Sequence, residues 1–248
     1  MPHNAPQPAS TQSSADAAQA QALQLAYALA HDLQTPLTVI AGQLSMAHRA
    51  ILQGADAKPH LIKANNSVQR VASLLEDLMA YAKAGVEHHA PELIDVGDMT
   101  RQLVDELRHF ADSKNVSVRQ PVCDRTLTLF ADRRALERSI LNLLSNAIKF
   151  TAAAEGPHEV LVFVGEVNNH IRLTIADSGP GIPEPMRANL FQPFKRAHPN
   201  VPGTGLGLAM VKRCADQLGG KVWLEDNPPR GTKAILELPM PVQQRIAA

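Results

Sequence analysis

Hydrophobic residues recur at helical spacing through the first third of the chain. Apolar positions between residues 17 and 51 lie three, four or seven residues apart, which predicts one long amphipathic helix. Gly54 follows, and glycine permits the left-handed backbone with which helices commonly end. A second helix is predicted over residues 59–84. The apolar stripes are Leu25, Leu29, Leu33, Leu37, Ile40, Leu44 and Ile51 in the first helix, and Leu61, Val68, Val71, Leu74, Leu75, Leu78 and Met79 in the second.

A short loop between two such helices predicts an antiparallel hairpin. Two helices alone cannot bury both stripes, so we expect the hairpin to dimerise into a four-helix bundle. This all-α domain is predicted over residues 20–84. Residues 1–19 are rich in Ala, Gln and Ser, and we expect them to be disordered.

The pattern changes after a predicted linker over residues 85–94. Helices and short β runs now alternate, and Asn168-Asn169 marks a hairpin turn between two of the strands. This order predicts an α+β sandwich over residues 95–240, with helices on one face of a mixed sheet, and a tail over residues 241–248. The expected helices are 97–113, 133–150 and 206–218, and the expected strands are 116–118, 126–129, 160–164, 171–175, 221–224 and 233–238.

Composition excludes several classes of protein. The 248 residues include 24 basic and 24 acidic side chains, so the chain lacks the basic footprint of a nucleic-acid-binding protein. No apolar run approaches the ~18 residues that a membrane span requires. The first twenty residues also lack the basic and apolar regions of a secretory signal. We therefore expect a soluble, cytoplasmic protein with no nucleic-acid partner and no membrane segment.

One polar cluster interrupts the first helix. His31 and Thr35 are four residues apart and share a helix face, and Asp32 lies beside them. Pro36 then removes a backbone donor, which costs roughly 3 kcal/mol in a helix interior. A bend beside a His-Asp pair suggests the hypothesis that this part of the helix is arranged for chemistry.

A second polar cluster lies on the helix predicted over residues 133–150. Asn142, Asn146 and Lys149 fall on one face. Two amides and an ammonium group on one stripe can hold a metal ion and phosphate oxygens. The alternative is an ordinary solvated helix face.

Two glycine-rich segments complete the candidate chemistry. Asp177 to Gly181 follows a predicted strand; its glycines permit close approach of a ligand, and Asp177 could accept a hydrogen bond from an exocyclic amine. Asp-x-Gly is also common in ordinary turns. Gly203 to Gly207 opens a helix, where backbone N–H groups favour phosphate. A dinucleotide fingerprint is excluded because residues 195–202 cannot form the central strand that it requires.

Together and in this order, these segments resemble the bacterial two-component sensor histidine kinases. Residues 31–36 are similar to the family's H-box, and residues 142–151 to its N-box. Three glycine motifs and an F-box correspond to residues 177–181, 203–207, 231–233 and 191–194. The resemblance covers residues 20–240. It implies a dimerisation and phosphoacceptor domain, followed by an ATP-binding domain of the GHKL (Bergerat) fold shared with gyrase- and chaperone-type ATPases.

The resemblance also implies roles for individual residues. His31 would be the phosphoacceptor, Asp32 its general base, and Thr35 would position water for phosphatase activity. Arg196 would contact the γ-phosphate of ATP, and residues 182–205 would form a lid over it. The nucleotide and metal site would comprise Asn142 and Asn146 for Mg²⁺, Lys149 for phosphate, Asp177 for the adenine amine, and Gly179, Gly181, Gly203, Thr204, Gly205, Leu206 and Gly207 around the nucleotide.

The family further implies a homodimer and transfer of the phosphoryl group to an Asp of a response regulator. Gln34 departs from the Arg that the family often has there. Most members of the family carry a sensor domain or membrane segments before this helix, so we expect either that the input comes from a separate sensor protein or that the chain lacks its sensor domain. One alternative is a GHKL-fold ATPase without histidine phosphorylation; those ATPases carry Glu where Asn142 stands, so hydrolysis should be slow. Another is a catalytically inactive dimeric scaffold.

Overall fold

The computed structural model describes residues 10–83, 89–121, 125–198, 201 and 203–240, and it describes the side chains of these residues except 10–28 and 31. The predicted tail over residues 241–248 and residues 85–88 of the predicted linker lie outside the described residues. The chain divides into two compact units, residues 1–76 and 77–248. Among the described residues, no helix combines the length and the hydropathy needed to cross a bilayer.

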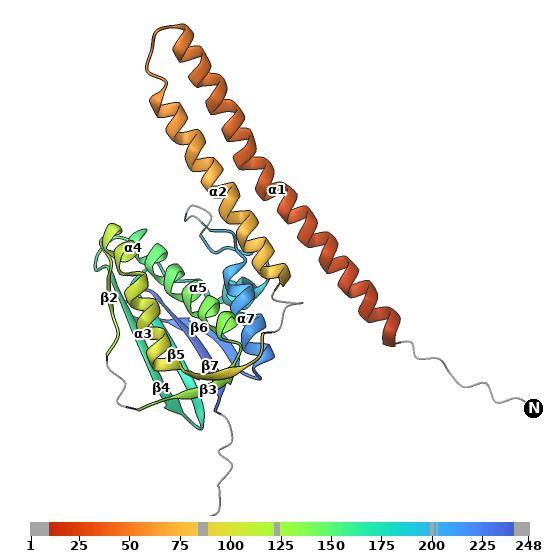
Figure 1. Ribbon diagram of the computed structural model, residues 1–248, viewed down its shortest axis with the longest axis vertical. Helices are drawn as coiled ribbons and strands as arrows, with labels where there is room; N and C mark the ends of the chain where they lie inside the picture. Colours follow the sequence, from red (N-terminus) through yellow and green to blue (C-terminus); the bar gives the residue numbers. More distant parts are fainter. Residues whose placement is uncertain (1–9, 84–88, 122–124, 199–200, 202, 241–248) are drawn as a thin grey trace, which may run out of the picture. The chain divides into compact units, whose positions relative to one another are not determined.

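Two antiparallel helices form the predicted hairpin, α1 (Ser10–Leu52) and α2 (Lys58–Lys83) (Figure 1). Gly54 lies in the loop with a φ of +68°, the left-handed conformation expected after a helix end. The prediction of disorder through residue 19 is wrong from Ser10 onward, because α1 already begins there. Residues 10–35 contain neither Gly nor Pro and are rich in Ala, the strongest helix former.

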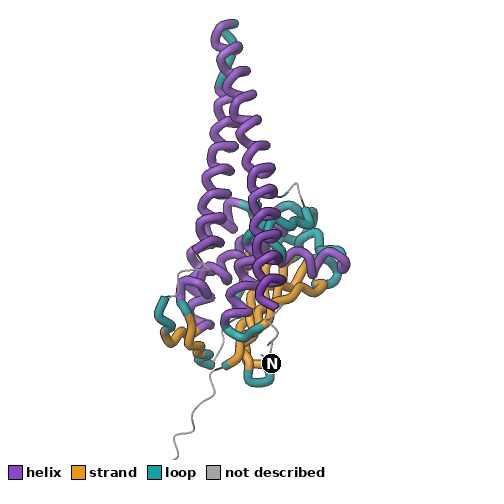
Figure 2. The backbone as a smooth tube through the Cα atoms, turned by 90° about the vertical axis from the view of Figure 1, so that its right-hand side faces the viewer, coloured by secondary structure: helices purple, strands orange, loops and turns teal. Residues whose placement is uncertain are grey.

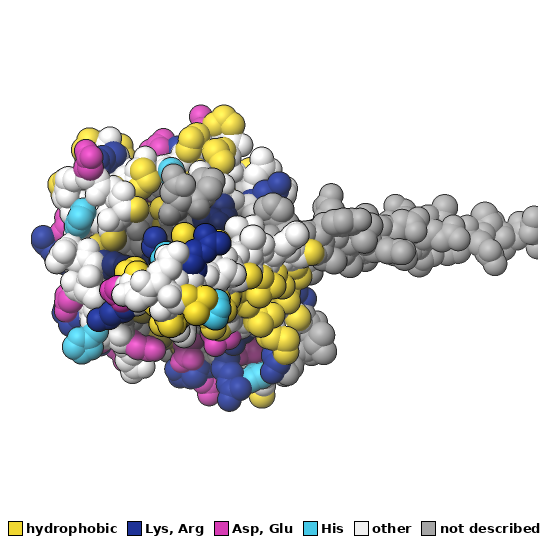
Figure 3. Space-filling model, turned by 90° about the horizontal axis from the view of Figure 1, so that it is seen from above, with side chains coloured by type: hydrophobic (Ala, Val, Ile, Leu, Met, Phe, Trp, Pro, Cys, Tyr) yellow, Lys and Arg dark blue, Asp and Glu magenta, His cyan; other side chains and the backbone are white. Residues whose placement is uncertain are grey.

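The hairpin buries several small side chains and leaves many large ones exposed. Ala47 and Ala64 are buried, and His60 Nδ1 lies 2.9 Å from Gln43 Oε1, which joins the two helices. Much of the predicted apolar stripe is 46–63% exposed, and hydrophobic side chains gather in a patch on the molecular surface (Figure 3). These exposed stripe residues include Leu37, Leu44, Ile51, Leu61, Val68 and Leu75.

The second unit is built on a five-stranded sheet with the order β2-β4-β5-β7-β6. β2 pairs with β4 in parallel and the other neighbours are antiparallel, so the sheet is mixed, as predicted. A separate two-stranded sheet pairs β1 with β3. The strands are β1 (Glu92–Asp95), β2 (Ser117–Arg119), β3 (Thr128–Ala131), β4 (Glu159–Val167), β5 (His170–Asp177), β6 (Lys221–Asp226) and β7 (Thr232–Pro239).

Helices cover one face of this sheet (Figures 1 and 2). The core lies between them and includes Leu136, Ile140 and Leu144 from α5 and Val160 and Leu173 from the sheet, all at most 2% exposed. The predicted two-layer α+β architecture is confirmed. The helices are α3 (Val96–Glu106), α4 (Arg108–Ser113), α5 (Arg133–Ala152), α6 (Glu184–Arg187) and α7 (Gly207–Gln217), with a 3-10 turn at Ala188–Phe191.

Two predicted boundaries are wrong. Residues 92–94, which we expected in the linker, form most of β1 because they pair with β3, at least 35 residues later, and a window of local sequence does not contain that partner. The helix expected over 97–113 is two helices, broken at Leu107, where the backbone has a ψ of 0°. By contrast, Asn168 and Asn169 form the expected turn between β4 and β5, with φ angles of 49° and 61°.

Candidate functional site

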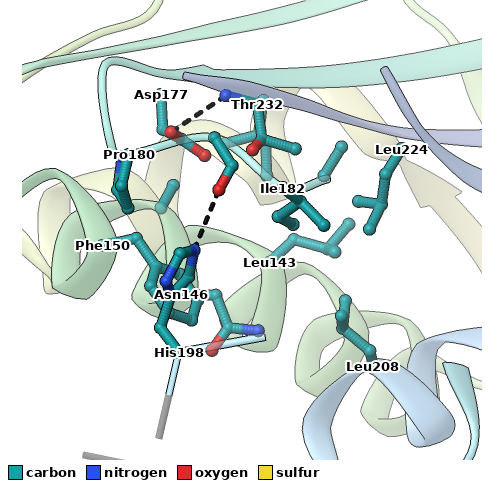
Figure 4. Close-up of a pocket in the computed structure, with 14 residues that line it drawn as sticks. Leu143, Asn146, Phe150, Asp177, Pro180, Ile182, His198, Leu208, Leu224 and Thr232 are labelled. Carbon is teal, nitrogen blue, oxygen red and sulfur yellow. Dashed lines mark hydrogen bonds between the residues drawn. The ribbon is translucent and has the colours of Figure 1, made fainter. Parts of the chain in front are cut away.

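A pocket lies between α5, the ends of β5 and β7, and the segments that follow β5 (Figure 4). Of the residues predicted to bind a nucleotide, Asn146, Asp177 and Gly181 line it together. Its wall is largely apolar, with few polar side chains. The lining residues are Leu143, Asn146, Ala147, Phe150, Ile175, Asp177, Pro180, Gly181, Ile182, His198, Leu208, Leu224, Thr232 and Ala234.

Asp177, at the end of β5, is the buried acidic group of this pocket and is only 7% exposed. Its Oδ1 accepts hydrogen bonds from the main-chain N–H groups of Gly179 (2.8 Å) and Thr232 (3.1 Å). Burial nevertheless raises the pKa of this carboxyl to about 6, because desolvation outweighs the two hydrogen bonds. Both bonds end on Oδ1, so Oδ2 is the oxygen that can accept a donor from a ligand.

Two glycines allow the backbone to pack closely against Asp177. A Cβ atom on Gly231, which has a φ of +121°, would overlap the carbonyl oxygen of Asp177. A Cβ on Gly179 would lie 2.9 Å from Asp177 Oδ1 and 3.2 Å from the main chain of Phe150. Only glycine therefore fits at these positions without a shift of the surrounding backbone.

The predicted polar stripe of α5 is partly buried, so it is not a fully solvated helix face. Within the described structure, the Nδ2 atom of Asn142 is buried and has no hydrogen-bond partner. Burial lowers the pKa of Lys149, and the nearby charge of Asp77 partly offsets this effect. A buried amide donor without a partner and a partly desolvated ammonium group favour binding of an anionic oxygen ligand.

The segment Gly203–Gly207 leads into the start of α7, as predicted. Gly205 has a φ of +75°, and a Cβ there would lie 2.7 Å from the Cα of Phe194. A Cβ on Gly207 would lie 3.0 Å from Asn142 Oδ1, so this glycine lets α7 approach the polar face of α5. The Thr204 hydroxyl donates to Asp77 Oδ2 at 2.7 Å and accepts from the Leu206 N–H at 3.3 Å.

Other predicted residues are not part of the pocket wall. Arg196 donates to the carbonyl of Val201 at 2.6 Å. Asp32 and Thr35 lie on α1 in the first unit, with Pro36 inside the helix as predicted. The side chain of His31 lies outside the described residues.

Several pocket residues were not predicted from the sequence. Phe150, directly after Lys149, and Ile182, directly after Gly181, adjoin recognised motifs, so their positions in sequence could have indicated them. His198 lies within residues 182–205, the segment expected to form a lid over ATP, whereas Leu224 carries no such signal because the fold alone brings it to the pocket. Asn227 also supports the site, since its Nδ2 donates to the Asp177 carbonyl at 2.8 Å.

Two family models match the chain. Residues 21–87 match the His Kinase A (phospho-acceptor) domain, and residues 131–242 match the histidine kinase-, DNA gyrase B- and HSP90-like ATPase domain. Both segments correspond to domains predicted from the motifs. The first match contains His31, and the second contains every residue of the pocket.

Curated relatives align with most of this chain. Adaptive-response sensory kinase SasA of Prochlorococcus marinus (strain MIT 9313) is 29% identical over 222 residues, which cover 88% of this chain and 58% of the relative. Autoinducer 2 sensor kinase/phosphatase LuxQ of Vibrio parahaemolyticus is 27% identical and is covered over 27% of its length. The chain thus spans little more than half the length of the SasA relatives it matches.

Solved structures have the same fold. Full-length ShkA in complex with AMPPNP is 26% identical with a TM-score of 0.61, covering 86% of this chain and 45% of that one. Histidine kinase ThkA in complex with response regulator protein TrrA is 21% identical with a TM-score of 0.70, covering 90% of this chain and 63% of that one.

Proposed function

The chain belongs to the two-component sensor histidine kinases, and from this premise we propose that it is an ATP-dependent protein-histidine kinase that phosphorylates itself on His31. One observation carries this assignment above all. A buried carboxylate, Asp177, and the polar face of α5 meet at one pocket, in a chain whose residues 21–87 match a phosphoacceptor domain.

The pocket suits the adenine ring of ATP. Its apolar wall can bury the faces of the base, and Asp177 Oδ2 can accept a hydrogen bond from the exocyclic amine. At pH 7 this carboxyl is mostly ionised, since its pKa is about 6, so it is an acceptor. Guanine presents a carbonyl oxygen where adenine has the amine, and the carboxylate would repel it.

The phosphates would extend toward Asn142, Asn146 and Lys149. The Asn142 amide donor without a partner suits a phosphate oxygen, and Lys149 supplies positive charge. We assign the amide oxygens of Asn142 and Asn146, which lie one turn apart on α5, as the protein ligands of Mg²⁺, because this ion prefers oxygen donors. When bound, Mg²⁺ would neutralise charge on the phosphates.

In the transfer step, a neutral ring nitrogen of His31 attacks the γ-phosphorus with its lone pair. The bond from phosphorus to the bridging oxygen breaks, and ADP leaves with that electron pair. Asp32, the next residue, would orient the ring and accept its proton. The product is a phosphoramidate, which acid hydrolyses readily and base does not.

Beyond this step, we propose that a response regulator accepts the phosphoryl group on an Asp. Thr35, one helical turn after His31, would position water when the enzyme removes that group again. The hairpin would dimerise through its exposed stripes. Leu37, Leu44 and Ile51 repeat at seven-residue steps, as do Leu61, Val68 and Leu75, which is the spacing of a helix-bundle seam.

The test is incubation of the purified protein with γ-labelled ATP and Mg²⁺. We expect acid-labile, base-stable label on the wild type and none on His31→Ala, because no other side chain replaces the attacking nitrogen. His48→Ala is the matched control: His48 lies on the same helix and is exposed, so labelling should be unchanged.

Two results would contradict the kinase assignment. Equal labelling of His31→Ala and wild type would place the acceptor elsewhere. Steady ATP hydrolysis that ignores the His31 substitution would instead favour an ATPase of the gyrase type. Chelation of the divalent ion should abolish labelling of the wild type and leave its fold intact.

A further inference from the structure

The segment between the 3-10 turn and α7 contributes a side chain, His198, to the pocket wall. Its Nε2 lies 2.9 Å from the main-chain carbonyl oxygen of Gly181 (Figure 4). A carbonyl oxygen can only accept a hydrogen bond, so Nε2 carries the hydrogen in this contact. The bond joins this segment to the loop after β5, which carries the glycines next to Asp177.

The ring of His198 also contacts Phe150 of α5. The two ring centroids are 5.7 Å apart with an angle of 58° between the planes, a tilted aromatic pair. Both rings line the pocket, whereas most of its other side chains are aliphatic. His198 thus makes one directed contact to the backbone and one aromatic contact, and both are at the site of the base.

We propose that His198 is a positioning residue for the adenine base: its ring forms part of the wall against the base, and its bond to Gly181 holds that wall in place. This role rests on the proposed binding of ATP. The Arg196 guanidinium, two residues away, bonds to Val201 instead, so the pocket contact from this segment is made by His198.

A residue that contacts the base has a distinctive signature in binding. Its substitution should weaken the binding of adenosine, ADP and ATP by the same factor, because all three present the same ring. Substitution of a residue that contacts the phosphates would leave the affinity for adenosine unchanged and would lower the affinity for ADP and, more strongly, for ATP. Adenosine and ADP, in the presence of Mg²⁺, are therefore the two probes, titrated by calorimetry against the whole chain.

We expect His198→Ala to weaken the binding of both adenosine and ADP by about tenfold, because the variant loses one hydrogen bond and one aromatic contact. The KM for ATP in autophosphorylation should rise by a similar factor, while the rate at saturating ATP stays within about twofold. His198→Phe retains a ring and His198→Asn retains a donor, so each should recover part of the affinity.

His170→Ala is the matched control. His170 is also half-buried and its Nδ1 also lies 2.9 Å from a carbonyl oxygen, that of Asn168, but it lies at the β4–β5 turn. Its substitution should leave adenosine affinity unchanged. Unaltered adenosine affinity in His198→Ala would overturn the role, as would a loss that grows from adenosine to ADP. A wild type that binds neither probe would instead reject the ATP site itself.

Discussion

At the scale of single residues, Asp177 has an unusual environment for an acidic side chain. Two main-chain N–H groups stabilise its charge, yet burial has the larger effect and raises its pKa to about 6. An ordinary surface Asp would be fully ionised at pH 5. Above pH 6 the Asp177 carboxyl is ionised but largely shielded from water, so it favours a ligand that donates a hydrogen bond to it.

This raised pKa predicts a pH dependence of stability. The folded state holds the proton up to about pH 6, whereas the unfolded chain releases it near the ordinary value of 3.8. Asp177 therefore contributes about 3 kcal/mol to the free energy of unfolding below pH 3.8. This contribution is lost as the pH rises to about 6. Asp177→Asn cannot titrate, so it should lack this loss.

Urea unfolding of both proteins at several pH values between 4 and 7 measures the difference. Trp223 in β6 is the single tryptophan of the chain, so its fluorescence reports the second unit. We expect the stability of Asp177→Asn to improve relative to wild type as the pH rises. Parallel pH profiles would show that Asp177 titrates normally.

Two glycines in the same unit provide a matched pair. Gly231→Ala would place a Cβ against the Asp177 carbonyl at a φ of +121°, so it should lower the free energy of unfolding by at least about 3 kcal/mol. Gly165 lies within β4, and a Cβ atom there would meet no other atom within 4 Å, so Gly165→Ala should change that free energy by less than about 1 kcal/mol. Trp223 fluorescence in urea again measures both, and similar stabilities would contradict the steric account.

At the scale of elements, α5 connects the fold to the chemistry. Asp132 caps its first turn through the N–H groups of Arg134 and Ala135. One face supplies Leu136, Ile140 and Leu144 to the core, and another presents the Asn142 and Asn146 amides. The same helix therefore stabilises the sheet and positions the polar groups, which a loop would hold less rigidly.

The hairpin provides an element-scale prediction. Leu44, 49% exposed in the single chain, lies on the seven-residue stripe, so Leu44→Asp should place a charge in the dimer seam and weaken dimerisation at least about 100-fold. Met46 is 52% exposed but two residues away around the helix, so Met46→Asp should remain dimeric. Sedimentation velocity distinguishes the two. Dimerisation of both variants would place the interface on another face.

At the scale of the whole molecule, the two units separate two tasks. The first carries the predicted acceptor His31 on a helix, and the second holds the pocket. The proposed phosphoryl transfer requires the ring nitrogen of His31 to reach the γ-phosphate of ATP. The chain covers 58% of the length of its SasA relative.

Sequence alone determined the two-domain architecture, most helices, the mixed sheet and the candidate residues Asn146 and Asp177, because helical periodicity and glycine motifs are local patterns. Tertiary structure decided what depends on distant partners. Strand β1 exists because it pairs with β3, and the pKa of Asp177 follows from burial and from Thr232, 55 residues later. His198 reaches the pocket for the same reason: its neighbours, Phe150 and Gly181, are close in space and distant in sequence.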